Sequence, residues 1–230
     1  MKNMSVKQKR VLIIIAVLIL VVAVIGISFA VFGHTSKGEV ENTIGTGTIE
    51  MAYSEASNTI TINNAMPMSE KQAKDLTNST ADDNNYYFDF TVSSKVLGDA
   101  TVNYDVVAFK NPVIKDGQTM PSVSDKDIRF RLEESTNEGS SYTKEIMPGT
   151  AWTATTEAND KTGAPSGVML LYSGSFGTKS KDGKEYTKTD GTEMKRYFRL
   201  RMWVDQAYVV DDTQRTFSVI VNVYGKTENE

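Results

Sequence analysis

The hydrophobic and polar positions of this chain follow two patterns in succession. Val11–Phe32 is a run of 22 residues without a charged side chain, whereas apolar residues from Ile49 onward recur mainly at every second position. Alternation with a period of two is typical of β-strands that place one face in a core and the other in water. The pattern therefore predicts one N-terminal hydrophobic helix followed by a β-rich domain.

Short alternating runs in this domain predict about eight to ten strands joined by polar turns. The clearest runs are 49–53, 60–62, 88–92, 102–108, 128–132, 168–172, 197–204 and 217–223. Val168–Tyr172 is apolar at every position, which predicts a strand that is buried on both faces. Many short strands with little helix favour a mainly β fold, a single β-sandwich ectodomain of the jelly-roll kind.

One helix and two long polar segments interrupt the strands. Ser69-Glu70-Lys71-Gln72 has the sequence of a capping box, and good helix formers follow as far as Leu76. The segments 134–165 and 177–193 are rich in Ser, Thr, Gly and Lys, and we expect extended loops or strand insertions there.

The N-terminal run has the length and the flanking charge of a membrane-targeting segment. As a helix, 22 residues span roughly 33 Å, which is enough to cross a bilayer. The positive-inside rule places the cations before it in the cytoplasm and the rest of the chain outside; these cations are Lys2, Lys7, Lys9 and Arg10. The length favours an uncleaved anchor, but Ser28-Phe29-Ala30 is an acceptable cleavage site before Val31, so the alternative is a signal peptide.

These features divide the chain into five predicted parts. They are a cytoplasmic basic segment at 1–10, a transmembrane helix or signal-peptide core at 11–32, a flexible tether at 33–46, a β-sandwich ectodomain at 47–226 and a polar tail at 227–230. The chain is accordingly expected to be a single-pass membrane protein with its C-terminus outside, or a secreted or cell-surface protein after cleavage.

Charge and cysteine content narrow the function classes. After the first ten residues the chain has 21 basic and 29 acidic side chains, a formal charge of −8. Such a domain, which lacks a basic stripe, is a poor partner for nucleic acid because phosphate contacts need clustered Lys or Arg. The chain contains no cysteine, which excludes disulfides, thiolate metal sites and thiol nucleophiles.

The junction after the hydrophobic run resembles the N-terminal region of the camelysin–TasA family. Ser28–Thr35 and Asn42–Met51 correspond to the end of the signal, near "FAYFSD", and to the first mature strand, near "NTFTAGTLDL". Val31 stands where an aromatic residue is usual, and His34 where an acid is common. The resemblance implies processing after Ala30 by a SipW-type signal peptidase, and a secreted jelly-roll-like protein that forms fibres or coats the cell surface.

Candidate catalytic residues are scarce. His34 is the one histidine, it lies in the predicted tether, and there is no HExxH sequence. A zinc hydrolase needs several His and carboxylate ligands, and a Ser-His-Asp triad needs a histidine inside the domain. We therefore expect no catalytic residues, no cofactor and no enzymatic activity.

Acidic pairs and clusters are candidates for glycosidase or calcium sites. Neighbours on a strand point to opposite faces, so Glu133-Glu134 and Asp211-Asp212 are better interpreted as turn or rim residues. Calcium prefers oxygen ligands, and the clusters that offer them are Asp82-Asp83-Asn84-Asn85, Asp125 with Asp127, and Asp211-Asp212. None has EF-hand spacing, which favours solvated loops over a metal site.

The run 197–204 offers a candidate interaction face. Phe198, Leu200, Met202 and Val204 share one face of this predicted strand, and the other face has Tyr197, Arg199, Arg201 and Trp203. Aromatic rings beside guanidinium groups can bind sugars or a partner protein. The alternative is a face covered by loops, with its arginines paired to acids.

The sequence thus favours an exported structural or interaction protein over an enzyme. In the assembling version, a free segment around Asn42–Met51 would add to the sheet edge of another copy. In the alternative version, a membrane-anchored module would use the loops 134–165 and 177–193 to bind a ligand or glycan. The predicted partners are the membrane through 11–32, a second copy, or another surface protein.

Overall fold

The computed structural model divides into two compact units, residues 1–33 and 34–230. Its described residues all belong to the second unit; they are 34–37, 44–46, 49–55, 66–78 and 86–228. Within these ranges no helix is long and apolar enough to cross a membrane, and the predicted span 11–32 lies outside them.

The described residues form mainly β-strands, as the alternation predicts. In chain order the elements are β1 (His34–Lys37), β2 (Ile44–Thr46), β3 (Ile49–Glu55), α2 (Glu70–Asp75), β4 (Tyr87–Leu97), β5 (Thr101–Lys110), β6 (Ile114–Lys115), β7 (Gln118–Thr119), η1 (Asp125–Asp127), β8 (Ile128–Ser135), β9 (Tyr142–Ala151), β10 (Met169–Gly177), η2 (Lys184–Tyr186), β11 (Asp190–Val204) and β12 (Val219–Glu228).

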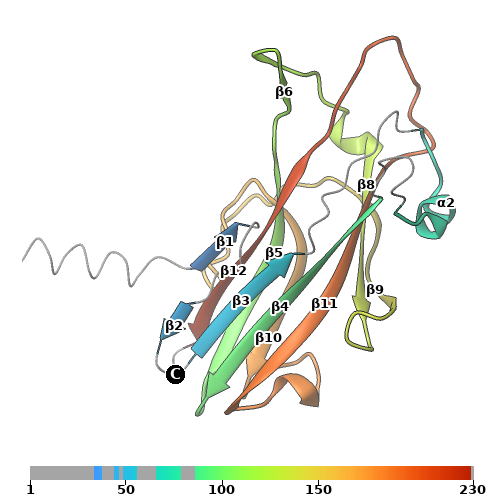
Figure 1. Ribbon diagram of the computed structural model, residues 1–230. Helices are drawn as coiled ribbons and strands as arrows, with labels where there is room; N and C mark the ends of the chain where they lie inside the picture. Colours follow the sequence, from blue (N-terminus) through green and yellow to red (C-terminus); the bar gives the residue numbers. More distant parts are fainter. Residues whose placement is uncertain (1–33, 38–43, 47–48, 56–65, 79–85, 229–230) are drawn as a thin grey trace, which may run out of the picture. The chain divides into compact units, whose positions relative to one another are not determined.

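Two antiparallel sheets pack face to face as a sandwich (Figure 1). One sheet has the order β1-β12-β5-β10, and the other has the order β2-β3-β4-β11-β8-β9. The short β6–β7 hairpin projects from one end. The mainly β, sandwich-like architecture is therefore confirmed.

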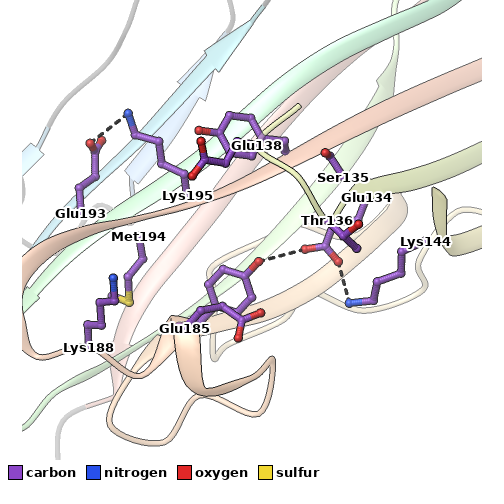
Figure 2. Close-up of a pocket in the computed structure, with 12 residues that line it drawn as sticks. Glu134, Ser135, Thr136, Glu138, Lys144, Glu185, Lys188, Glu193, Met194 and Lys195 are labelled. Carbon is purple, nitrogen blue, oxygen red and sulfur yellow. Dashed lines mark hydrogen bonds and ion pairs between the residues drawn. The ribbon is translucent and has the colours of Figure 1, made fainter. Parts of the chain in front are cut away.

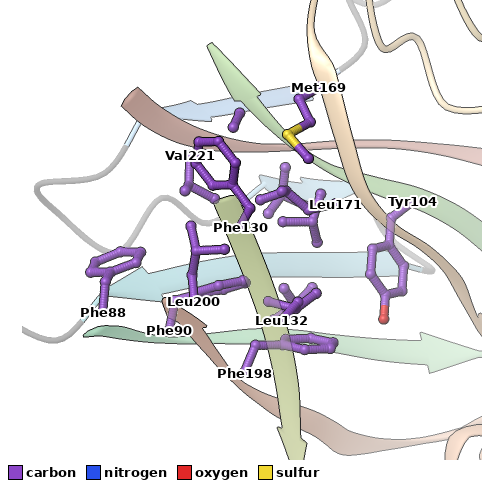
Figure 3. Close-up of a cluster of buried hydrophobic side chains, with 14 of the residues drawn as sticks. Phe88, Phe90, Tyr104, Phe130, Leu132, Met169, Leu171, Phe198, Leu200 and Val221 are labelled. Atoms are coloured by element: carbon purple, nitrogen blue, oxygen red, sulfur yellow. The ribbon is translucent and has the colours of Figure 1, made fainter. Parts of the chain in front are cut away.

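The core lies between the sheets and is filled by the inward-facing residues of the alternating runs (Figure 3). Phe90 on β4 stacks on Phe198 of β11 with ring centroids 5.3 Å apart. Tyr104 on β5 stacks on Phe176 of β10 at 5.1 Å in the opposite sheet. Aromatic pairs of this kind stabilise a core beyond the area that they bury.

The predicted helix and its capping box are confirmed. The Ser69 hydroxyl accepts from the Gln72 N–H at 3.4 Å, and the Ser69 N–H donates to Gln72 Oε1 at 2.9 Å. The helix lies against β11, because Arg201 Nη1 donates to the carbonyl oxygens of Ala73 (3.3 Å) and Leu76 (2.9 Å). The Arg201 guanidinium thus donates to carbonyl oxygens at the C-terminus of the helix, which have no hydrogen-bond partner within the helix itself.

Several predicted boundaries and environments are wrong. Leu170 is 42% exposed, so the run at 168–172 is not buried on both faces. The run belongs to β10, which is an edge strand, and the side chain of Leu170 points away from the core. The predicted tether 33–46 contains β1 and β2, which pair with β12 and β3. β12 continues to Glu228, into the predicted tail. The run at 60–62 lies outside the described residues.

The two long polar segments are more ordered than predicted. The segment 134–165 contains β9, which pairs with β8, and its second half packs against the outer face of β5. There the buried Asp105 carboxylate accepts from Asn159 Nδ2 and Thr162 Oγ1, both at 2.7 Å. The segment 177–193 contains η2 and the first residues of β11.

Candidate interaction site

The predicted interaction face does share one side of β11, but half of it is covered. Arg201 is 7% exposed and Trp203 is 4% exposed. A Cβ atom at Gly149 of β9 would lie 2.9 Å from the Trp203 ring, so Trp203 packs tightly under that strand. Arg201 is bonded to the end of α2 and to Glu133 (Nε–Oε2, 3.3 Å). Arg201 and Trp203 therefore fit the alternative stated above, in which this face is covered by other parts of the chain and its arginines pair with acids.

An ion network fastens α2 to this outer face. Arg131 on β8 pairs with Glu133 (Nε–Oε1, 2.8 Å), with Glu70 of α2 (Nη1–Oε1, 2.5 Å) and with Glu145 of β9. Burial lowers the pKa of Arg131, but the bonds to Glu133 and Glu145 outweigh burial and raise it overall. The prediction of Glu133 as a turn or rim residue is wrong, since Glu133 is buried. Its carboxylate can be buried because it forms ion pairs with Arg131 and Arg201.

Arg199 is held between two tyrosine rings. Its guanidinium carbon lies 3.7 Å from the Tyr87 centroid and 4.2 Å from that of Tyr142. Its Nε and Nη2 donate to the two oxygens of Asp89 at 2.7 and 2.8 Å. This bidentate pair uses two of the five N–H donors of the guanidinium group. The half-buried rings of Tyr87, Tyr142 and Tyr197 remain at the surface of this face.

A second arginine crosses the interior between the sheets. Arg196 of β11 is 1% exposed, and its Nε donates to Glu134 Oε1 at 2.6 Å. Its Nη1 reaches Asp182 Oδ2 at 2.9 Å and the hydroxyl of Tyr104 at 3.3 Å, and it also donates to the hydroxyl of Tyr172. Tyr104 and Tyr172 belong to the opposite sheet, so one guanidinium joins both layers.

Sequence reasoning missed this network. The prediction of Glu134 as a turn or rim residue is wrong, since Glu134 is 2% exposed and points toward Arg196. Burial raises the pKa of the Glu134 carboxyl, but bonds from Arg196 and Lys144 lower it below its ordinary value overall. The sequence did contain a signal for the buried arginine. Arg196 lies two residues before Phe198, so both side chains point to the inward face of β11.

A groove of about 460 Å³ opens beside this network (Figure 2). Its lining includes Thr136 and Glu138, which follow β8, as well as Tyr186 of η2 and Tyr197 of β11. Lys144 Nζ bonds Glu134 Oε2 at 2.8 Å across its inner end. The groove combines aromatic rings with charges of both signs, which suits a polar ligand.

A second cavity of about 500 Å³ lies where the β6–β7 hairpin meets the start of β12. Its lining is more apolar than that of the groove, and it includes Val113, Met120 and Phe217. Lys110 pairs with Asp125 at 2.6 Å at this cavity. Asp125, a candidate calcium ligand in the sequence, therefore already has a cation as its partner.

The other predicted site residues give no metal centre in the part of the chain that the structure describes. No group of three or more His, Cys, Asp or Glu side chains there is arranged so that it could hold a metal ion. Asp211 bonds Arg215 at 2.9 Å in an exposed loop beside Asp212. The cluster Asp82–Asn85 and the candidate processing residues Ser28, Ala30 and Val31 lie outside the described residues.

With this geometry established, the chain was compared with known proteins. No protein-family model, curated protein or solved structure matches it. Its function must therefore be argued from its own residues.

Proposed function

We propose that this chain is an exported bacterial cell-surface protein with a structural or interaction role. The observation that carries the proposal is the order of its parts: four cations, then the uncharged run Val11–Phe32, then a cysteine-free domain. Basic residues before an apolar segment direct the C-terminal remainder of a chain to the outside. A domain on the outside that has no disulfides must rely on its core, and the sandwich has a continuous one.

The arrangement of charged groups supports a scaffold. Arg131, Arg196 and Arg199 are each bonded to carboxylates of the same chain. These pairs connect strands and helix to one another, which makes the domain rigid. A rigid domain with satisfied charges suits assembly or display on a surface.

In the assembling version, we propose a fibre- or matrix-forming subunit with a jelly-roll topology, in line with the resemblance of its junction. The segment that would be donated is not a free one: β3 pairs with β4 of the same chain, from Ile49↔Val96 to Glu55↔Phe90. Donation therefore requires exchange of β1–β3 between copies in place of this pairing. A full-length chain that stays monomeric at high concentration would exclude this version.

The test of export is the N-terminus and mass of the native protein from the producing cell. A mature start at Val31 supports a secreted, assembling subunit. An intact Met1 in the membrane fraction, with the domain cleaved by protease added outside intact cells, supports a single-pass anchor. An intact chain in the cytoplasm, protected from that protease, would refute export.

A second candidate function is a displayed binding module, anchored by 11–32. The groove favours it, since Tyr186 and Tyr197 line a cavity of about 460 Å³ together with acids and lysines. Cavities of this size commonly hold ligands. Binding of a soluble ligand that is lost when the groove is filled by a larger side chain would support this function.

A further inference from the structure

The cavity at the base of the β6–β7 hairpin is separate from the groove of Figure 2. Its volume is about 500 Å³, and the two share no lining residue. The residues that line it lie in three segments of the chain, 110–113, 119–125 and 216–218. Figure 1 shows the hairpin at the end of the sandwich where β5 ends and β12 begins. Small-molecule sites commonly have a volume of this order.

Backbone hydrogen bonds join these segments into a frame. The Met120 N–H donates to the Val113 carbonyl oxygen at 2.8 Å, which closes the base of the hairpin. The Thr216 N–H donates to the Pro121 carbonyl oxygen at 2.9 Å, and the Val123 N–H donates to the Thr216 carbonyl oxygen at 3.0 Å. The shape of the cavity is therefore fixed by the fold, and a ligand that enters it has little backbone to order.

One part of the cavity is apolar. Val113, Met120 and Phe217 line it, and all three are half-buried, so their side chains remain accessible to a ligand. The Phe217 ring continues into the core, with its centroid 6.0 Å from that of Trp152 and 6.0 Å from that of Phe130. An apolar group that covers these side chains removes apolar surface from water, which favours binding.

The charged part of the cavity is a single ion pair. Lys110 Nζ lies 2.6 Å from Asp125 Oδ1 and 2.7 Å from Asp125 Oδ2. The two side chains are 46% and 47% exposed, so the pair stands where the cavity meets the solvent. An ammonium group has three donors and a carboxylate accepts at about four positions, so each partner can bond a ligand as well.

We propose that this cavity binds a free α-amino acid with an apolar side chain. The side chain of the ligand fills the apolar part, beside Met120 and Phe217. Its carboxylate accepts from Lys110, and its ammonium group donates to Asp125. This inference goes beyond the proposed function, because it concerns a different cavity and depends neither on export nor on the groove.

The ion pair favours a zwitterion over a ligand with one charge. Lys110 would attract an anion, but Asp125 beside it would repel that anion, and for a cation the two effects are reversed. A zwitterion places an opposite charge against each partner, and electrostatic complementarity of this kind gives specificity. A half-exposed pair contributes little to stability by itself, so sharing its bonds with a ligand costs the fold little.

The experiment titrates the full chain in detergent by isothermal titration calorimetry. L-Phenylalanine, L-leucine and L-methionine are the zwitterions with an apolar side chain, and glycine is the zwitterion without one. Two probes keep the phenyl ring but carry one charge each: 3-phenylpropanoate is the anion and 2-phenylethylamine is the cation.

Two variants each remove one charge of the ion pair, Lys110→Met and Asp125→Asn. Both side chains are about half exposed, so the fold should tolerate the changes. Lys126→Met is the matched control, because Lys126 is exposed, follows Asp125 directly and does not line the cavity.

We expect wild type and Lys126→Met to bind the apolar amino acids alike, and at least about tenfold more tightly than glycine or either singly charged probe. Lys110→Met should prefer 2-phenylethylamine to 3-phenylpropanoate, and Asp125→Asn should show the opposite preference. A general loss of folding cannot produce opposite preferences. In wild type the bound amino acid should also shift the methyl NMR resonance of Met120, which is assigned by its absence from Met120→Leu.

Three results would overturn the inference. The first is that none of the apolar amino acids binds at about 10 mM. The second is that the singly charged probes bind wild type as tightly as L-phenylalanine, which would refute recognition of a zwitterion. The third is binding that leaves the Met120 resonance unchanged, which would place the ligand elsewhere. Export is tested separately by the N-terminus of the native protein, so each of these results would leave that proposal standing.

Discussion

Replacing Arg196 with Met tests whether the buried network holds the two sheets together. The substitution keeps a long apolar side chain but removes the donors to Glu134, Asp182, Tyr104 and Tyr172. Glu134, 2% exposed, would keep Lys144 as its one cationic partner. Removing one partner of a buried ion pair costs about 3–5 kcal/mol, because the other charge stays buried without compensation.

The free energy of unfolding is measured by urea denaturation of the full chain, followed by tryptophan fluorescence. Both tryptophans, Trp152 and Trp203, lie in the sandwich, so the signal reports this domain. Arg215→Met removes an exposed pair with Asp211 and should leave the midpoint unchanged. A second change, Glu134→Met, should restore part of the loss in the double variant. A loss below about 1 kcal/mol for Arg196→Met, or full additivity in the double variant, would refute this reasoning.

Three further predictions use the same assay. The fold lowers the pKa of Glu134, so its carboxylate adds to the free energy of unfolding above its unfolded pKa, near 4.5, and this contribution is lost as pH falls through the folded pKa. Glu134→Gln should therefore flatten the loss of stability in acid, and an unchanged pH profile would contradict this prediction. Ser69→Ala should cost about 1 kcal/mol by removing the helix cap, whereas Ser124→Ala at η1, where no side chain caps, should cost less; equal losses would count against the capping argument. Gly149→Ala should cost about 1–3 kcal/mol and alter Trp203 emission, because the new Cβ meets that ring at 2.9 Å; a neutral result would mean that β9 shifts freely.

The strands that the sequence predicts are those with one face in the core. β4, β5, β8 and β11 carry apolar residues at every second position because each faces the opposite sheet. β9 was missed because it lies at a sheet edge, where its backbone ladder to β8 and its outer-face ion pairs hold it in place. Lys144, Glu145 and Pro148 interrupt the alternation there. Alternation therefore detects core strands and misses edge strands.

The candidate site divides in a similar way. Alternation correctly placed Tyr197, Arg199, Arg201 and Trp203 on one face of β11. It did not predict that α2 covers part of this face, because Arg201 and Ala73 are 128 residues apart in the sequence. The direction of a side chain is a local property of its strand. Whether another element packs over that strand face, and how strands align with one another, depend on the assembled sheets.

The adjacent acids Glu133 and Glu134 anchor the end of β8 on both faces of the sheet. They point to opposite faces, so Glu133 fixes the outer side through Arg131 and Arg201, while Glu134 fixes the interior through Arg196. One pair of neighbouring residues thus connects β8 to the outer ion network and to the interior between the sheets.

Two edge strands, β10 and β9, carry residues that oppose strand addition. On β10, Asp182 accepts from the Ser175 N–H at 2.8 Å, and Ser180 donates to the Ser175 carbonyl at 2.6 Å, so side chains already occupy that edge. On β9, an edge strand of the six-stranded sheet, Pro148 has no backbone N–H to donate. Blocked edges of this kind prevent indiscriminate pairing.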